Sequence, residues 1–306
     1  MHSHDTAFQM TELESAAALV HRVVPATPQY AWPKLSRRAG CTVWVKHENH
    51  TPTGAFKVRG GLVHLDRLRR ATPRISGVIS ATRGNHGQSI AFAAARTGLP
   101  ATIYVPRNNS QDQNSAIAAF GARVVEFGKD FDEAKHEAFR VAAAEGLHFV
   151  PSFHRDLVIG VATYALELFG AVRDLDAVYV GVGMGSGISG LIAVRDLLGL
   201  KTEIIGVGAA KAPATALSFA AGRPINAPSA QTFADGLATR EPNAEAMGIY
   251  FDDTHQVAEG AGAAPLAALL QERHRMAHKN VAVVLSGGNI ERARYLQVLS
   301  GVTPAT

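Results

Sequence analysis

Short apolar runs alternate with helical patterns in the chain between residues 76 and 150. Apolar runs at 77–81, 101–106, 122–127 and 147–151 are separated by segments in which apolar residues recur at helical spacing. This alternation is typical of βαβ units, which place their strands in a parallel sheet. A second series of the same kind runs from 157 to 208 and ends with an apolar run at 281–288. A chain of 306 residues exceeds the size at which one core usually divides, so we predict two α/β lobes.

Composition and charge exclude several classes of protein. The net charge is only +4, and Lys and Arg do not cluster with aromatic residues, so we expect no nucleic-acid partner. The N-terminus lacks a signal-peptide pattern and no apolar run reaches membrane-spanning length, which predicts a cytoplasmic protein that does not bind membranes. The single cysteine, Cys41, excludes an internal disulfide, and the histidines show no metal-binding spacing.

Three loops rich in glycine or small polar residues follow predicted strands. They are SATRGNHGQ (80–88), GVGMGSGISG (181–190) and SGGN (286–289). Ligands of parallel sheets bind at the carboxyl ends of strands, where backbone N–H groups and helix N-termini point toward them. The segment GMGSG is suited to a phosphate group because successive N–H groups form an anion-binding nest. A glycine-rich turn without a ligand remains the alternative for this loop taken alone.

A nicotinamide cofactor is a poor fit to the second loop. Gly185, Gly187 and Gly190 have the GxGxxG spacing, but that motif needs a carboxylate at the end of the next strand to hold the ribose. Residues 205–210 read IGVGAA and contain no carboxylate. We therefore do not expect an oxidoreductase.

Pyridoxal phosphate fits the three loops and a lysine better. This cofactor needs a Schiff-base lysine, a phosphate nest, a partner for the ring nitrogen and a group near the 3′ oxygen. Lys57, residues 183–187, Ser286 and Asn85 supply such a set. A lysine between small and aromatic residues in a partly dry cleft would have a lowered pKa, as a nucleophilic amine requires.

Four motifs occur in an order that resembles a known family. They are KHENHTPTGAFKVRG (46–60), TRGNHGQ (82–88), GMGSG (183–187) and SGGN (286–289). The chain resembles the fold-type II pyridoxal-phosphate enzymes, in the threonine/serine dehydratase branch that includes serine racemase. The resemblance implies an α/β fold of two lobes, each with a mainly parallel sheet flanked by helices, as in the tryptophan synthase β-subunit. It predicts a large cofactor-binding domain (1–75 and 153–306), a small mobile substrate-loop domain (76–152), and a homodimer.

The resemblance also implies roles for individual residues. Lys57 would carry the cofactor and remove the Cα proton of the substrate. The expected cofactor-binding residues are Phe56, Lys57, Asn85, Gly183, Met184, Gly185, Ser186, Gly187 and Ser286. The expected substrate-binding residues are Thr82, Arg83, Gly84 and His86, although a structural hydrogen bond is the alternative for His86.

A hydroxyl group opposite the ring nitrogen need not keep that nitrogen protonated, which favours β-elimination. The expected activity is therefore the conversion of a β-hydroxy amino acid to a 2-oxo acid and ammonia. L-threonine, L-serine or a 3-hydroxyaspartate-like acid would be the substrate. A β-replacement enzyme of the cysteine-synthase type and a non-enzymatic cofactor-binding protein remain alternatives.

The sequence departs from the family pattern at several positions. Met184 and Ser186 stand where tetraglycine is typical, which backbone binding tolerates if their side chains point away. Residues 206–216 contain no Asp or Glu for a divalent cation, so we expect no metal requirement. Arg83 replaces a serine that returns a proton in serine racemase, so racemisation should be weak. Its guanidinium favours an anionic substrate, unless the side chain turns outward. The chain ends soon after SGGN, so we expect no feedback by isoleucine.

Overall fold

The computed structural model describes residues 7–208, 213–223, 225 and 244–304, and these form two compact units. The first unit comprises Met1–Pro25 and Thr51–Thr163, and the second comprises Ala26–His50 and Tyr164–Thr306. The predicted small domain, 76–152, lies wholly in the first unit. The first unit is larger than the predicted small domain, because it also contains residues 1–25, 51–75 and 153–163. The predicted mobility of residues 76–152 stays a prediction.

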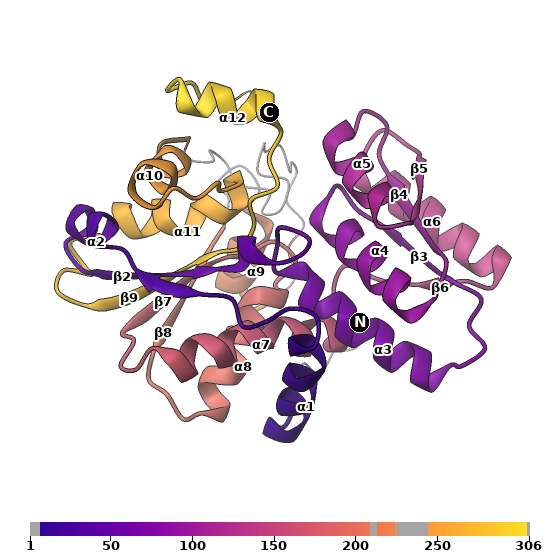
Figure 1. The fold of residues 1–306 in the computed structure, drawn as a ribbon, viewed down its shortest axis with the longest axis horizontal. Coiled ribbons are helices and arrows are strands. Elements are labelled where there is room, and N and C mark those ends of the chain that lie inside the picture. Colours follow the sequence, from indigo (N-terminus) through magenta and orange to yellow (C-terminus); the bar gives the residue numbers. More distant parts are fainter. Residues whose placement is uncertain (1–6, 209–212, 224, 226–243, 305–306) are drawn as a thin grey trace. The chain divides into compact units, whose positions relative to one another are not determined.

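A four-stranded sheet forms the centre of the first unit (Figure 1). Its order is β5-β4-β3-β6, and all neighbouring strands pair in parallel. The strands are β3 (Val78–Ala81), β4 (Ala101–Val105), β5 (Arg123–Glu126) and β6 (His148–Phe149). The helices after them are α4 (Asn85–Thr97), α5 (Gln111–Ala119) and α6 (Phe131–Glu145). The predicted alternation of strands and helices between 76 and 150 is confirmed.

Helix α6 shows how local sequence sets these elements. It begins after Asp130, whose carboxylate accepts a hydrogen bond from the Glu133 amide at 3.0 Å, and it ends at Gly146 with φ 65°. Side-chain capping of a first-turn N–H and a left-handed glycine are favourable helix ends. The small side chains of Ala134, Ala138 and Ala142 then pack against the apolar face of β3.

Two further helices complete the first unit. They are α1 (Met10–His21) and α3 (Lys57–Ala71), and α3 packs along α4. Helix α7 (Arg155–Ala171) contributes its first residues to the first unit and its later residues to the second. The packing of α3 on α4 explains why residues 57–71 belong with 76–152.

A five-stranded sheet forms the centre of the second unit, in the order β1-β2-β9-β7-β8. Strand β1 pairs antiparallel with β2, and the other neighbours are parallel. The strands are β1 (Gln29–Ala31), β2 (Thr42–His47), β7 (Ala177–Gly181), β8 (Glu203–Val207) and β9 (Asn280–Leu285). The predicted architecture of parallel sheets flanked by helices is therefore confirmed, with β1 as an antiparallel edge strand.

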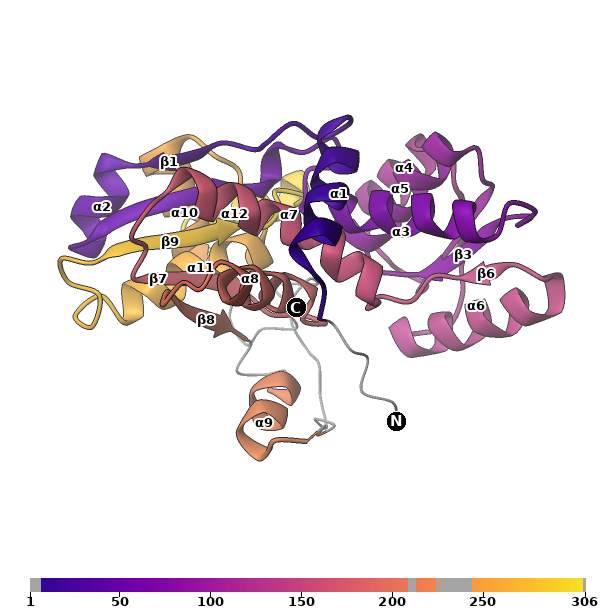
Figure 2. The same cartoon turned by 90° about the horizontal axis from the view of Figure 1, so that it is seen from below.

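Helices cover both faces of this sheet. Figures 1 and 2 show α2, α10, α11 and α12 on one face and α8 with the later part of α7 on the other. The helices of this unit, apart from α7, are α2 (Pro33–Ala39), η1 (Glu48–His50), α8 (Ser186–Leu197), α9 (Ala214–Ala221), α10 (Ala244–Thr254), α11 (Gly260–Gln271) and α12 (Arg292–Leu299). The buried core lies between the helices of the first face and strands β2, β7 and β9. The helices contribute Leu35, Tyr250 and Leu266 to it. Among the described residues, no helix has the length and apolar character that crossing a membrane requires.

Candidate active site

Lys57 is the first residue of α3, and a tight turn fixes its position. The Thr51 hydroxyl accepts a hydrogen bond from the Ala55 amide at 3.0 Å and donates one to the Ala55 carbonyl at 2.8 Å. Gly54, inside this turn, has φ 66°, a conformation that side chains with a Cβ rarely adopt. The lysine is half-buried, and its Nζ lies 5.1 Å from the centroid of the Phe56 ring, which is also half-buried.

The residues after Lys57 hold α3 against its neighbours. The Ser89 hydroxyl, on α4, donates a 2.6 Å hydrogen bond to the Lys57 carbonyl. A Cβ at Gly61 would lie only 2.4 Å from the Ser89 Oγ, and one at Gly60 would lie 2.8 Å from the Leu157 carbonyl oxygen. The glycines after the lysine therefore allow close helix packing. They anchor the backbone from which the Lys57 side chain projects.

Arg59 also holds α3 in place, through hydrogen bonds inside the unit. Its side chain is fully buried, and its Nη1 donates a hydrogen bond to the Thr163 hydroxyl at 3.1 Å. Thr163 in turn donates to the Gly160 carbonyl at 2.7 Å. A buried charge is costly unless hydrogen bonds satisfy it, so this network fixes the registry of α3 against α7.

The loop between β3 and α4 is organised by Thr82. Its buried hydroxyl accepts hydrogen bonds from the amides of Gly84 at 3.0 Å and Gly87 at 3.2 Å. Asn85, partly exposed, begins α4 directly after this turn. The Arg83 side chain is exposed. The loop thus presents the N-terminus of a helix, whose dipole favours an anion such as a carboxylate.

His86 is buried beneath the same loop and is held neutral. Ser80 donates its single hydroxyl proton to the Val150 carbonyl at 2.7 Å, so its oxygen accepts from His86 Nε2 at 3.2 Å. The pKa of His86 is lowered to about 3, mainly by burial and also by the positive charge of Lys57. The structural hydrogen bond that was the alternative for His86 is thus present, formed with a strand residue.

The second unit carries the predicted phosphate loop. Gly183, Met184 and Gly185 join β7 to α8, and Gly185 has φ 98°, in the left-handed region that favours glycine. Ser186 and Gly187 are buried at the start of α8, and the Tyr164 hydroxyl donates to the Gly187 carbonyl at 3.1 Å. Met184, in contrast, is 61% exposed.

Ser286 lies at the same sheet edge as this loop. It follows β9, which pairs in parallel with β7, so the carboxyl ends of both strands lie together. The Glu259 amide donates to the Gly287 carbonyl at 3.1 Å. A Cβ at Gly262 would lie 2.4 Å from that carbonyl oxygen, so α11 supports the Ser286 loop through a position where only glycine fits.

The first motif also contributes a buried charge network to the second unit. Lys46 Nζ lies 2.6 Å from Glu167 Oε2 and donates to the Thr27 carbonyl at 2.8 Å. The Thr27 hydroxyl donates to Glu48 Oε1 at 2.6 Å. Lys46 and Glu48 are fully buried and bind these partners, so the lysine and glutamate of the motif stabilise the strand that precedes the Lys57 turn.

These arrangements fit pyridoxal phosphate within each unit. The left-handed Gly185 and the N-terminus of α8 form a cradle for a dianionic phosphate, and the buried Ser286 hydroxyl lies at the same edge. The first unit supplies an amine at Lys57 and an amide at Asn85. Residues 183–187 would hold the phosphate, Ser286 would face the ring nitrogen, and Lys57 would carry the cofactor.

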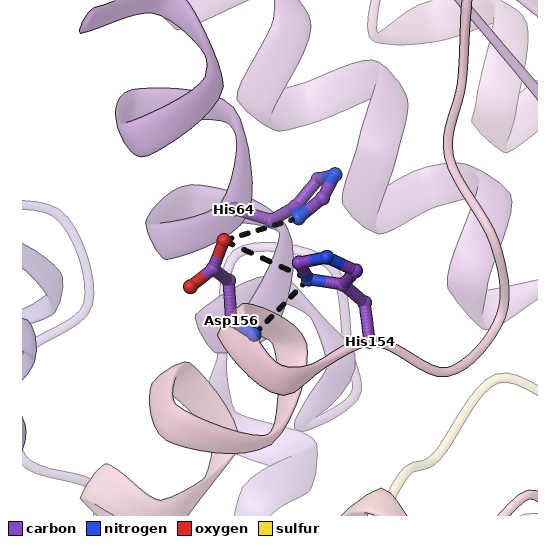
Figure 3. A group of neighbouring side chains, drawn as sticks. All are labelled: His64, His154 and Asp156. Atoms are coloured by element: carbon purple, nitrogen blue, oxygen red, sulfur yellow. Dashed lines mark hydrogen bonds and ion pairs between the residues drawn. The ribbon is translucent and has the colours of Figure 1, made fainter. Parts of the chain in front are cut away.

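Sequence reasoning missed one group of side chains in the first unit. His64, His154 and Asp156 lie together (Figure 3), although His64 is far from the other two in sequence. The fold alone brings α3 beside the start of α7, so spacing could not indicate this group. The carboxylate-free stretch 206–216 lies partly outside the described residues, because 209–212 are not described.

Comparison with known proteins gives the family. Residues 20–250 match the family described as pyridoxal-phosphate dependent enzyme. The biosynthetic L-threonine dehydratase of Haemophilus influenzae is 32% identical over 296 residues, which cover 89% of this chain and 58% of that protein. The L-threonine ammonia-lyase of Geobacter sulfurreducens is 34% identical over 280 residues, covering 84% of this chain and 69% of that protein. The chain thus spans somewhat more than half the length of the first of these relatives.

Solved structures agree with this result. The processed form of threonine deaminase isoform 2 from Solanum lycopersicum matches with a TM-score of 0.87 and 27% identity, covering 96% of this chain and 94% of that one. A pyridoxal 5′-phosphate-dependent aspartate racemase matches with a TM-score of 0.87 and 25% identity, covering 96% and 99%. The chain belongs to the family of pyridoxal-phosphate-dependent enzymes, in the fold-type II group that includes the threonine dehydratases.

Proposed function

We propose that this protein is a dehydratase, or ammonia-lyase, that converts a β-hydroxy amino acid such as L-threonine or L-serine to a 2-oxo acid and ammonia. The observation that carries the proposal is the pairing of the 183–187 nest with the Ser286 hydroxyl at one sheet edge. Relatives named as L-threonine dehydratase and L-threonine ammonia-lyase support the same reaction.

Pyridoxal phosphate, when bound, withdraws electrons from the amino acid and so makes its Cα proton acidic. The Lys57 amine is the base that takes this proton. The Asn85 loop binds the substrate carboxylate through N–H groups at the start of α4. Ser286 offers a neutral hydroxyl to the ring nitrogen, which favours loss of the β-hydroxyl group over reactions that need a long-lived negative charge at Cα.

The test is a substrate panel on the purified holoenzyme, with ammonia and 2-oxo acid both measured. Equal amounts of the two products from L-threonine or L-serine are expected. Sulfide-dependent formation of a new amino acid without ammonia release would instead favour a β-replacement enzyme. A yellow protein that turns over none of these compounds would favour a cofactor-binding protein without catalysis. A Lys57→Ala variant is the control for contaminating activity.

We further propose that Arg83 selects an anionic side chain, as in a 3-hydroxyaspartate-like acid. Arg83 is exposed on the loop that begins α4, where its guanidinium can pair with a second carboxylate. The similarity to an aspartate racemase supports an acidic substrate. A higher kcat/KM for the anionic substrate than for L-serine is expected, and the Arg83→Ser variant should reduce this preference.

We also propose that the protein is a cytoplasmic homodimer. Its ligand is a small amino acid, and it does not bind nucleic acid. Relatives in amino-acid metabolism and the weak net charge of +4 support it. Size-exclusion chromatography with light scattering tests the dimer, and a monomer mass at micromolar concentration would contradict it. Cell fractionation tests the compartment, and recovery of the protein outside the cytoplasmic fraction would contradict that part.

A further inference from the structure

A buried histidine of α3 lies beside a second histidine and a carboxylate in the first unit (Figure 3). His64 lies two turns along the helix that begins at Lys57, and His154 and Asp156 lie at the start of α7. Each of the three residues offers one ligand atom, and these atoms lie within 4.8 Å of one another. None of the three belongs to the residues that would hold the cofactor.

The His64 side chain is buried with neither ring nitrogen hydrogen-bonded. It is 4% exposed, and both Nδ1 and Nε2 lack a hydrogen-bond partner. Most buried polar atoms in native proteins have a partner, so an imidazole with two unsatisfied nitrogens needs an explanation. A ligand that binds to a ring nitrogen would supply one.

The distances in the group suit coordination better than hydrogen bonding. Asp156 Oδ2 lies 3.7 Å from His64 Nδ1 and 3.6 Å from His154 Nδ1. Both separations exceed a normal hydrogen bond, which spans about 2.7–3.2 Å. Two ligands about 2.0–2.1 Å from one tetrahedral metal ion lie about 3.3–3.4 Å apart, so small side-chain movements would close the site.

Hydrogen bonds around the group orient the carboxylate of Asp156 and fix the protonation of one nitrogen of His154. Arg67 Nη1 holds the other oxygen of the carboxylate, Asp156 Oδ1, at 2.6 Å, which leaves Oδ2 directed at the two imidazoles. Such outer partners commonly orient metal-binding carboxylates. The Asp156 amide donates to His154 Nδ1 at 3.1 Å, so this nitrogen carries no proton, and a turn of the ring would direct its lone pair to a metal.

We propose that His64, His154 and Asp156 form a binding site for a divalent transition-metal ion of the Zn²⁺ type, with water completing the coordination. Two imidazoles and one carboxylate suit zinc and similar ions, whereas Mg²⁺ prefers oxygen ligands alone. The Arg67 guanidinium opposes a cation electrostatically, and the metal must offset this repulsion through its two nitrogen ligands. The ion would link the helix that carries Lys57 to the start of α7, and so would stabilise the first unit.

Zinc titration of the holoenzyme tests the site. The background is a His2→Ala/His4→Ala double variant, because N-terminal histidines bind zinc on their own. Isothermal titration in chelator-treated buffer should show one strong Zn²⁺ site per chain. Replacement of Zn²⁺ by Co²⁺ should give visible absorption from a site with nitrogen and oxygen ligands. Loss of outer partners lowers metal affinity about 10–100-fold, so loss of a ligand in His154→Ala should lower it by about 100-fold or more.

Matched variants separate this site from surface binding. His154 is partly exposed, so its replacement by alanine should leave the fold intact even where His64→Ala fails to fold. His136→Ala removes an exposed histidine of the same unit and should leave zinc affinity unchanged. Zinc should raise the melting temperature of the background protein but not of His154→Ala. Equal affinity in His154→Ala and the background, or no saturable binding at all, would overturn the proposal.

Discussion

Burial of His86 should make the folded protein less stable in mild acid, and replacing His86 by glutamine should reduce this effect. The imidazole of His86 is buried in the first unit and donates from Nε2 to Ser80. A glutamine amide places a donor near the same point and carries no titratable proton. The substitution therefore removes the titration while preserving the hydrogen bond to the serine.

The expected magnitude follows from the two pKa values of His86. The folded protein lowers the pKa from 6.5 to about 3, so the unfolded chain binds more protons than the folded chain between these values. Stability must then be fully present above pH 6.5 and fall as the pH is lowered toward 3. One pKa unit is worth about 1.4 kcal/mol, so lowering the pH from about 7.5 to about 5.5 should cost about 1.4 kcal/mol through this residue.

A second histidine, His47, should contribute a similar loss of folding stability in acid and serves as an internal reference. Burial lowers the pKa of His47, in the second unit, to about 4. Burial also lowers the pKa of His148. The effects of His47 and His148 persist in the His86→Gln variant, so the pH dependence should fall by somewhat less than half if both units unfold in one transition. If the units unfold separately, only the transition of the first unit should change.

Urea unfolding at a series of pH values measures this dependence, with cofactor in equal excess throughout. His136→Gln, an exposed histidine of the same unit, is the control and should behave as the wild type. In the folded protein, the His86 side-chain NMR signal should not titrate between about pH 8 and about pH 5. An unchanged pH dependence in His86→Gln, or a signal that titrates near 6.5, would refute the reasoning.

Four other outcomes are expected. Lys57→Ala should abolish 2-oxo acid formation. Borohydride reduction of the wild type should attach the cofactor permanently to Lys57, and a cofactor label on another lysine would contradict the assignment. Arg83→Ser should leave cofactor absorbance unchanged but lower kcat/KM selectively for anionic substrates by about 10- to 150-fold, since a charged hydrogen bond contributes about 1.5–3 kcal/mol. An equal loss for all substrates would contradict a role in side-chain recognition. Gly160→Ala should destabilise the first unit by about 1–3 kcal/mol, because the added Cβ would lie 2.4 Å from the Arg59 carbonyl oxygen. The urea unfolding midpoint measures this loss, and an unchanged midpoint would show that α7 can shift to make room. Chelator should leave the initial rate unchanged while lowering the melting temperature, and a rate restored only by Mg²⁺ would disprove the expected absence of a metal requirement.

The periodicity of the sequence predicted the two sheets because parallel strands must be connected by helices. Four apolar runs between 76 and 150 became the strands β3 to β6, and the loops after β7 and β9 came to one edge because these strands pair in parallel. Such positions follow from topology, since every loop after a parallel strand emerges at the same edge. This is why residues 183–187 and Ser286 could be placed together before the fold was known.

Contacts between elements distant in sequence were beyond the same reasoning. Residues 51–75 belong to the first unit because α3 packs on α4, and nothing in the sequence of α3 states which helix it meets. His64 lies beside His154 and Asp156 for the same reason. The Ser80 partner of His86 was also missed, because a serine inside an apolar strand gives no sign of where its hydroxyl points.

The glycines around Lys57 have a packing role that the sequence motif does not state. Gly60 and Gly61 face α7 and α4 at distances that exclude a Cβ. Gly160 faces the Arg59 carbonyl in the same way. These glycines let three helices pack closely around the buried guanidinium of Arg59, which fixes the backbone at Lys57. The motif therefore positions the lysine through packing behind it, and substitutions at these glycines should act on the reaction through the geometry of Lys57.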